Sequence, residues 1–344
     1  MGITRPRSPL ARFLLALGAI LALVAPLQPA TAVAAPADPV AAAAQVEPAV
    51  VRLDTEIEYQ NALGVGTGIV LDPGGQVLTN FHVVQGADRI HATVAGRSFP
   101  AELVGYDRRR DVAVLQLLGA VGLPTAAIGD SAQLVEGEPV VALGNAGGSA
   151  SPLTREVGEI TGFGRTVNAE DALTGSSDEL TGLIEFAAPV RAGDSGGPVV
   201  NGAAQVVGIT TAASVNFRLG PGGEGFAIPI NDAMAVAGQI RSRTPSDTVH
   251  IGPPVLLGVG VRTGQRDEPG VLLHEVLRGG PAERAGLVNG DILTVLDGTP
   301  LDSATTLTYV LDRHYPGDVL DVTWIDATGQ QRTGKAALTP ATVS

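Results

Sequence analysis

Short apolar runs separated by turn residues occupy most of the chain after residue 50. Glycine, proline, asparagine and aspartate fall between the runs. Short strands at such regular spacing are typical of β-barrels and β-sandwiches, whereas βαβ units would place longer helical patterns between them. The runs that we expect to form strands are 66–71, 77–79, 103–106, 112–117 and 140–143.

Helices are expected at a few places that carry capping signals. Asn231 is a good N-cap for the apolar run 233–240, which would close the first β-rich region. Farther along, Pro281 and Gly286 bracket a short helix, and Ser303 can cap another. Two further strands are expected at 319–324 and 331–337.

Length and composition predict two folded domains. The 344 residues are too many for one small domain, at a loose guide of about 150 residues per domain. Hydrophobic residues make up 44% of the chain and aromatic residues 3%, so aliphatic side chains must build the cores and the whole chain cannot be disordered. The net charge of −13 argues against nucleic acid as a partner, because nucleic-acid-binding faces are basic. The chain has no cysteine, which excludes disulfides, thiolate metal sites and lipoprotein attachment.

The first 34 residues are expected to be a signal peptide. Arg5, Arg7 and Arg12 give a positive start, an apolar stretch follows, and small residues then offer cleavage sites. An uncleaved anchor is the alternative, although the apolar stretch is short for a membrane span, which needs about 20 apolar residues. We therefore expect export, cleavage, no transmembrane segment in the mature protein, and a location in the cell envelope or outside the cell. Residues 35–48 are rich in alanine and proline and are expected to be flexible.

Residues 193–198 read GDSGGP and describe a serine in a tight, glycine-rich turn. A serine hydroxyl is a poor nucleophile at neutral pH, so it needs a base and also donors that hold the oxyanion formed in the reaction. The glycines let the backbone N–H groups of Gly193 and Ser195 point at one spot, as an oxyanion hole requires. The hexamer alone is about equally often a structural loop, so the assignment depends on other residues.

Two other segments supply the missing groups. His82 follows an apolar, strand-like run, and histidine is the side chain whose ordinary pKa suits a general base. Asp111 opens the apolar run 112–117, where its carboxylate could accept the imidazole N–H; Asp107 is a rival for this role. The chain order His82, Asp111, Ser195 is that of the chymotrypsin-type triad.

With these segments the sequence resembles the HtrA/DegP serine proteases, in which a trypsin-like domain precedes a PDZ domain. The similarity runs from about residue 50 to the C-terminus and includes motifs at 66–70, 208–212 and 225–229. It implies a mainly β fold: a chymotrypsin-like double β-barrel of two six-stranded barrels with the catalytic residues between them, then an α+β PDZ domain that is a partly open β-barrel. In that family Ser195 would be the nucleophile, His82 the general base and Asp111 the orienting carboxylate.

The resemblance and the patterns together divide the chain into five segments. They are the signal peptide 1–34, the flexible segment 35–48, the protease domain 49–242, the linker 243–254 and the PDZ domain 255–344. The linker is polar and contains proline, as linkers commonly do.

The resemblance also implies where a substrate binds. Enzymes of this type that cut after Arg or Lys carry an acid six residues before the serine, where this chain has Pro189 followed by Val190. A cationic side chain would therefore be buried without a partner, which is strongly unfavourable. We expect a small or medium aliphatic residue in this pocket, with Ile209 on the opposite wall. Backbone groups for an extended substrate strand are expected at Thr211, Ala212 and Ala213.

PDZ domains bind a peptide C-terminus as an added strand at a sheet edge and hold its carboxylate with backbone N–H groups of a short loop. The matching loop in this chain is Leu257, Gly258 and Val259. Gly258 would let the amides converge. A merely structural apolar strand is the alternative.

The leading hypothesis is an ATP-independent serine endopeptidase for misfolded or exposed polypeptides, without cofactor or metal. The sequence has no phosphate-binding loop motif and no His-Glu-x-x-His pair. Two alternatives stay open: a polypeptide-binding chaperone or adaptor that uses the protease fold mainly as a scaffold, and an esterase, because acyl transfer is common to both. A trimer is the family's habit, but only Tyr59 lies near the region that would supply its aromatic contacts.

Regulation of the site is left open by two features. Asp194 stands where asparagine is commoner in this family. In trypsin-like zymogens the corresponding aspartate pairs with a newly cleaved N-terminus, which the N-terminal segment of this chain is unsuited to supply.

The polar stretches 170–181 and 216–225 are either mobile loops that gate the site or ordinary surface loops. The triple arginine at 108–110 is most simply a solvated turn.

Overall fold

The computed structural model describes residues 1–2, 38–57, 62–148, 151–170, 177–211, 223–262 and 270–341. The chain divides into two units, Met1–Ala35 and Pro36–Ser344. The predicted signal peptide therefore lies outside the described residues apart from its first two. All the elements below belong to the second unit.

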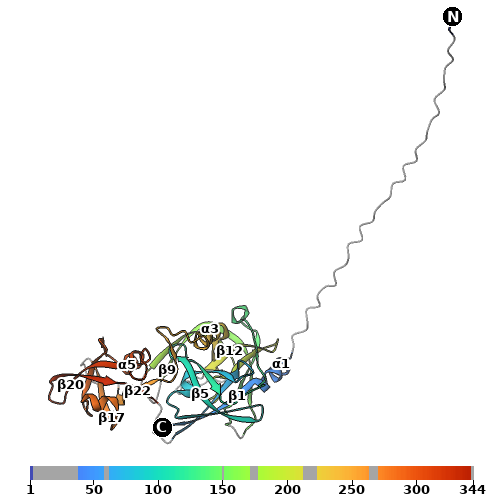
Figure 1. Cartoon of the computed structure of the whole chain (residues 1–344). Helices are drawn as coiled ribbons and strands as arrows, with labels where there is room; N and C mark the ends of the chain where they lie inside the picture. Colours follow the sequence, from blue (N-terminus) through green and yellow to red (C-terminus); the bar gives the residue numbers. More distant parts are fainter. Residues whose placement is uncertain are drawn as a thin grey trace. The chain divides into compact units, whose positions relative to one another are not determined.

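Six strands close the first β-barrel. Their order is β5-β4-β1-β2-β3-β6, and β6 pairs back with β5. β1 and β5 of this barrel are labelled in Figure 1. β1 alternates buried and half-buried residues, whereas β6 is almost wholly buried, as expected for a continuous apolar run covered on both faces. The strands are β1 (Val50–Ile57), β2 (Ala62–Val70), β3 (Gln76–Thr79), β4 (Arg89–Val94), β5 (Arg97–Asp107) and β6 (Val112–Leu117).

A second set of six strands closes another barrel. Its order is β11-β8-β9-β10-β13-β12, and β12 pairs back with β11; the short β7 (Ala127–Ile128) adds parallel to β12. The predicted double barrel is thus confirmed. The strands are β8 (Pro139–Gly144), β9 (Thr154–Glu170), β10 (Ser177–Phe186), β11 (Pro198–Asn201), β12 (Gln205–Thr211) and β13 (Gly225–Pro229).

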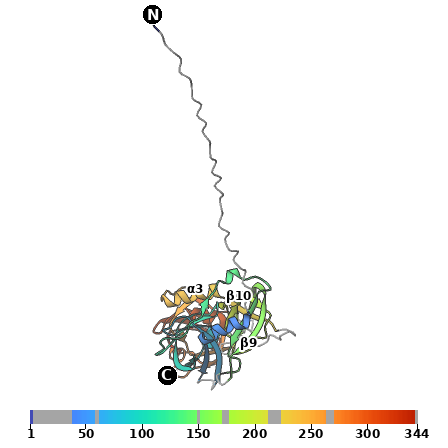
Figure 2. The same cartoon turned by 90° about the vertical axis from the view of Figure 1, so that its right-hand side faces the viewer.

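One apolar core joins the two barrels. Ile69 and Leu78 of the first barrel belong to the same buried cluster as Leu143 and Ile228 of the second. The helix α3 (Ile230–Arg241), labelled in Figure 2, packs on strands of both barrels, including β6 and β12. Because protein interiors are close-packed, this shared core fixes the loops of one barrel relative to those of the other.

The described part of the segment before the first barrel is helical, so the expectation of a flexible stretch at 35–48 is wrong for residues 38–48. α1 (Pro39–Val46) follows Asp38, whose carboxylate accepts the Val40 N–H at 3.0 Å, and a 3₁₀ turn, η1 (Glu47–Ala49), leads into β1. Ala43 and Val46 are buried in the shared core, and the helix lies against β8 and β11. Small side chains allow this close contact, so burial does not require large ones.

Regular structure also occurs in the predicted linker. β14 (Val249–Ile251) pairs with β5, and Val249 belongs to the shared core. The helix before the linker begins two residues earlier than the predicted cap implies, with Pro229 at its N-cap. Asn231 is therefore not the cap; its side-chain amide donates to Asp130 at 2.7 Å, beside the 3₁₀ turn η3 (Ser131–Gln133).

The second domain is built on a sheet with the strand order β16-β17-β18-β20-β21. The two helices described in this domain occur where the capping signals predicted them. α4 (Pro281–Ala285) ends at Gly286 with φ +99°, and Ser303 Oγ caps α5 (Ala304–Leu311) by accepting the Thr306 N–H at 3.2 Å. The strands are β15 (Val255–Leu256), β16 (Val259–Arg262), β17 (Val271–Val276), β18 (Ile292–Leu296), β19 (Thr299–Pro300), β20 (Val319–Ile325), β21 (Gln331–Ala337) and β22 (Thr339–Pro340).

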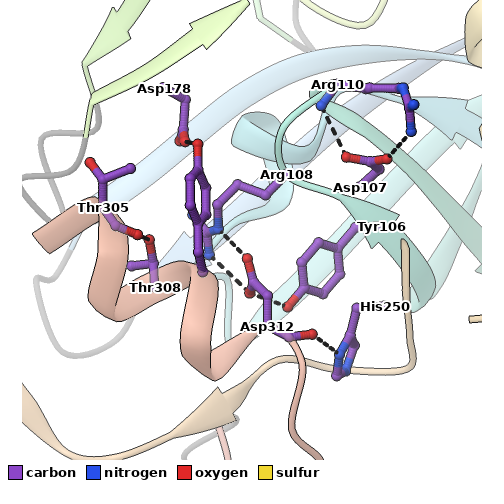
Figure 3. A network of polar contacts seen from close by, with 10 residues as sticks. Tyr106, Asp107, Arg108, Arg110, Asp178, His250, Thr305, Thr308 and Asp312 are labelled. Carbon is purple, nitrogen blue, oxygen red and sulfur yellow. Dashed lines mark hydrogen bonds and ion pairs between the residues drawn. The ribbon is translucent and has the colours of Figure 1, made fainter. Parts of the chain in front are cut away.

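Asp312, the residue after α5, carries a largely buried carboxylate that joins the second domain to the first barrel. Tyr106 Oη donates to Asp312 Oδ1 at 2.7 Å, and Arg108 Nε donates to Oδ2 at 2.6 Å (Figure 3). His250 Nδ1 lies 2.9 Å from the backbone oxygen of Asp312. The side chains of Arg108 and Asp312 are only 8% and 12% exposed, so the prediction of a solvated turn is wrong for Arg108.

The charge state of this contact follows from its burial. Burial alone would lower the pKa of the Arg108 guanidinium, but the charge and the hydrogen bond of Asp312 outweigh it and leave that pKa above its ordinary value. Burial and then the Asp312 charge raise the pKa of Tyr106 well above its ordinary value. Both groups therefore keep their protons. The Arg108 guanidinium also lies over the ring of Phe81, 4.8 Å from its centroid. Phe81 directly precedes His82 in the sequence.

Asp312→Ala should lower the free energy of unfolding by about 3–5 kcal/mol, because it leaves the buried Arg108 without its counter-ion. Chemical denaturation of the full chain measures this. The matched control is Asp321→Ala, which breaks an ion pair with Lys335 whose side chains are 71% and 68% exposed and should change stability little. Equal effects of the two substitutions would show that the Asp312 contact is not a buried pair in solution.

Candidate active site

His82, Asp111 and Ser195 lie in three connections that the barrels hold in place. His82 is in the short helix α2 (Phe81–Val84), directly after β3. Asp111 ends the turn between β5 and β6, and Ser195 lies in the turn between β10 and β11. The first barrel therefore supplies the histidine and the aspartate, and the second supplies the serine.

One carboxylate binds His82 at two points. Asp111 Oδ2 lies 2.8 Å from His82 Nδ1, and Asp111 Oδ1 accepts the His82 backbone N–H at 2.9 Å. The Asp111 side chain is 7% exposed and the His82 side chain 41%. A carboxylate next to Nδ1 favours the tautomer that carries its proton there, which leaves Nε2 as the basic nitrogen.

Asp111 has further partners, and its backbone is strained. Thr211 Oγ1 of the second barrel donates to Oδ2 at 3.2 Å, and Asn80 Nδ2 donates to the Asp111 backbone oxygen at 2.9 Å. Asp111 itself has φ +53°, in the left-handed region. Asp107, the rival in the sequence, instead accepts Arg110 and Thr248 donors at 2.7 and 2.8 Å and so stabilises its own turn.

Thr67 of β2 fastens the serine turn to the first barrel. Its N–H donates to the Ser195 oxygen at 2.8 Å, and its Oγ1 donates to the Gly193 oxygen at 2.7 Å. Its own carbonyl accepts Thr79 Oγ1 at 2.6 Å, three residues before His82. Neither threonine was recognised as part of the site from the sequence, although Thr67 falls in a motif of the family resemblance.

The serine turn requires glycine at two positions. The turn 191–194 is closed by the Asp194 N–H, which donates to the Arg191 oxygen at 3.0 Å, and its third residue, Gly193, has φ +96°. Such turns need a residue that tolerates positive φ at this place. Gly196 has φ +84°, and a Cβ there would lie 2.0 Å from the Thr67 oxygen. The oxyanion-hole role of the Gly193 and Ser195 N–H groups stays a prediction.

Comparisons with known proteins agree with this arrangement. A model of the trypsin-like peptidase domain matches residues 66–209, and a PDZ domain model matches residues 255–325. Serine protease PepD of Mycobacterium tuberculosis is 32% identical over 338 residues, covering 90% of this chain and 70% of that protein. The chain belongs to the HtrA family of serine proteases with a PDZ domain.

Two other relatives support the family assignment. A probable periplasmic serine endoprotease, DegP-like, from Halomonas elongata is 34% identical over 75% of this chain, and this chain spans 53% of its length. Among solved structures, the HtrA-type protease AlgW with a decapeptide has a TM-score of 0.50 and 26% identity, covering 87% of this chain and 97% of that one.

The predicted specificity residues of this HtrA-family chain are only partly described. Val190 is 7% exposed. Ile209 has no exposed surface and packs in the shared core, so its place in a pocket wall stays a prediction. The Thr211 hydroxyl binds Asp111. Ala212 and Ala213 lie outside the described residues, as do Tyr59 and residues 171–176 and 216–222 of the two predicted gating loops.

The predicted carboxylate loop of the PDZ domain lies beside a sheet edge. Leu257 and Gly258 turn their carbonyls inward: they accept the N–H groups of Ala282 and Leu277, both at 2.9 Å. Gly258 has φ +80°, which only glycine adopts freely. β16 follows at once, and in the described sheet it is an end strand, as strand addition requires.

The described residues hold no cluster of three or more His, Asp or Glu side chains that could bind a metal ion. None of the described helices is long and apolar enough to cross a membrane.

Proposed function

We propose that this protein is an exported, ATP-independent serine endopeptidase that cleaves misfolded or exposed polypeptides through an acyl-enzyme. The observation that supports it most is the two-point contact between Asp111 and His82, at 2.8 and 2.9 Å. A carboxylate in that position orients the imidazole and stabilises its protonated form during the reaction. The same carboxylate also binds Thr211 of the barrel that carries Ser195.

Each residue has one role in the proposed mechanism. His82 takes the Ser195 proton through Nε2 while the serine oxygen attacks the substrate carbonyl. The N–H groups of Gly193 and Ser195 hold the resulting oxyanion. His82 then gives its proton to the leaving amine, and water releases the acyl group by the same steps in reverse. The Asp111 carboxylate stabilises His82 while the imidazole carries the second proton.

The proposals of export and of a polypeptide substrate are supported by features outside the His82–Asp111 contact. The charged start and the short apolar stretch of residues 1–34 favour a cleaved signal peptide and a location in the cell envelope or outside the cell. One relative is described as periplasmic. A mobile, exposed polypeptide is the expected substrate, because an extended strand can pair with backbone groups beyond Thr211.

The proposed specificity is for small or medium aliphatic residues before the cut. Pro189 and Val190 offer no counter-ion where cationic substrates would need one. Gly223 packs against Pro189: a Cβ added there would lie 2.6 Å from the Pro189 Cα. Fragments of a digested protein should therefore end mainly in Val, Ala, Ile or Leu.

Ser195→Ala should abolish cleavage of unfolded casein and leave the fold intact. Loss of a triad residue costs on the order of a million-fold in rate. Gel analysis and mass spectrometry of the fragments measure both cleavage and specificity. The control is Ser98→Ala, at an exposed position on β5, which should behave as wild type.

Two results would contradict this function. Turnover by Ser195→Ala above roughly a tenth of the wild-type rate would remove the serine from the mechanism. Wild-type protein that leaves casein intact but prevents its aggregation, equally with and without Ser195, would favour the chaperone or adaptor function instead.

We further propose that the PDZ domain captures free peptide C-termini at residues 257–259. The loop next to the edge strand β16 is suited to hold a carboxylate with backbone N–H groups. A substrate held there would have a raised effective concentration at Ser195.

Gly258→Ala should weaken binding of a peptide with an apolar free C-terminus, and amidation of that C-terminus should weaken binding to the wild type. The loss is expected because alanine disfavours φ +80° and would displace the loop. Gly329→Ala is the control: Gly329 has φ +79° in the turn between β20 and β21, with nothing within 4 Å of an added Cβ. Calorimetry measures the affinities. Equal binding of acid and amide peptides would rule out carboxylate capture.

A further inference from the structure

Asp194, the residue before Ser195, is a buried carboxylate. Only 1% of its surface is exposed. Burial of an ionised carboxylate is costly unless hydrogen bonds or charges compensate it. In trypsin-like zymogens the ammonium group of a new N-terminus provides that compensation, and the sequence left open what does so in this chain.

Within the described residues, three neutral donors meet the carboxylate. Thr154 Oγ1 donates to Oδ1 at 2.5 Å, and the Ala146 N–H donates to the same oxygen at 3.1 Å. The Arg191 N–H donates to Oδ2 at 2.9 Å. Hydrogen bonds to an ionised acceptor are shorter than neutral ones and roughly twice as strong. Of the three donors, Thr154 is the only side chain.

The backbone of the second barrel is shaped to admit this carboxylate. Gly144 at the end of β8 is paired with Thr154 at the start of β9. A Cβ on Gly144 would lie 2.1 Å from Asp194 Oδ1. The carboxylate therefore lies over this glycine, and any larger residue there would push it away from the threonine hydroxyl.

The same carboxylate holds the oxyanion turn. Asp194 binds Arg191 twice: its Oδ2 accepts the Arg191 N–H, and its own N–H donates to the Arg191 oxygen at 3.0 Å. These two bonds close the turn around Gly193, which has φ +96°. A change in the Asp194 side chain is thus transmitted directly to the backbone on both sides of Gly193.

Neighbouring ion pairs on β9 are weaker restraints. Glu156 accepts the Arg191 guanidinium at 2.5 Å, but the Arg191 side chain is 61% exposed. Arg155 pairs with Glu47 and is 50% exposed. Exposed ion pairs contribute little because water and side-chain entropy offset their attraction. Among these three successive residues, Thr154 makes the bond to a buried charge.

We propose that Thr154 is a positioning residue for the oxyanion turn, an inference that rests on the proposed function. Its hydroxyl anchors Asp194 and so keeps Gly193 and Ser195 in the conformation that holds the oxyanion. An internal hydroxyl and two amides take the place that a cleaved N-terminus has in trypsin-like zymogens. Thr154 does not touch the substrate, so its loss lowers the rate of acylation and leaves substrate affinity nearly unchanged.

The test compares Thr154→Val with Thr154→Ser. Thr154→Val removes the hydroxyl at nearly constant shape and should lower kcat on a short peptide about tenfold to hundredfold, the factor expected for one lost bond to a charged group, with KM within about twofold. Thr154→Ser restores the donor and should recover most of kcat. Thr161→Val, the same change at an exposed position on β9, is the control and should match wild type.

Two further readouts separate positioning from general stability. A peptide boronate, which forms a tetrahedral adduct with a reactive serine, should lose affinity for Thr154→Val in proportion to kcat, while melting temperatures stay close together. Asp194→Asn should lower kcat to a value between those of wild type and Thr154→Val, because the amide oxygen accepts hydrogen bonds but the amide nitrogen does not. An extension added at the N-terminus should leave kcat unchanged.

Several outcomes would overturn the proposal. They are wild-type kcat in Thr154→Val, equal losses in Thr154→Val and Thr154→Ser, unchanged boronate affinity, or an extended chain that becomes active only after its extension is removed. Ser195→Ala is measured alongside. If Ser195→Ala is inactive and Thr154→Val matches wild type, this inference alone fails; if Ser195→Ala is active, the proposed function itself fails.

Discussion

The arrangement of the site depends on the Asp111 carboxylate, which is held at the boundary of the two barrels. It accepts two N–H groups of His82 and the hydroxyl of Thr211, while Asn80 holds the backbone oxygen of the same residue. A left-handed conformation at a residue other than glycine costs on the order of 1–3 kcal/mol and persists only where surrounding contacts impose it. The contacts that impose it at φ +53° are the ones that orient the histidine.

Buried charges determine the local geometry more than the exposed ion pairs do. Asp111 and Asp194 each have a set of donors from more than one element, and the turn that ends at Asp111 is also held by the Arg108 contact with Asp312 of the second domain. The PDZ domain thus contributes to the packing around the turn that ends at Asp111. Exposed pairs such as Arg191 with Glu156 add little, because solvent screens them.

Features encoded locally could be predicted from the sequence, and features that depend on tertiary packing could not. The serine turn needs glycines at positive φ, and the ends of α4 and α5 carry caps, so short windows of sequence revealed all of them. α1 and β14 gain their stability from the shared core, which no window shows. Arg108 looked like a solvated residue because its counter-ion lies about 200 residues away in sequence. Thr154 carried no signal, since its role requires Asp194 to lie over Gly144.

The most direct test of this account is proton NMR of the full-length protein, observing the proton between His82 Nδ1 and Asp111 Oδ2. A hydrogen bond of 2.8 Å to a buried carboxylate should give a resonance far downfield of the amide region. The account predicts that Asp111→Asn abolishes this resonance, because an amide no longer stabilises the Nδ1–H tautomer. It predicts that Asp107→Asn retains it. A resonance that survives Asp111→Asn, or one that only Asp107→Asn removes, would contradict the account.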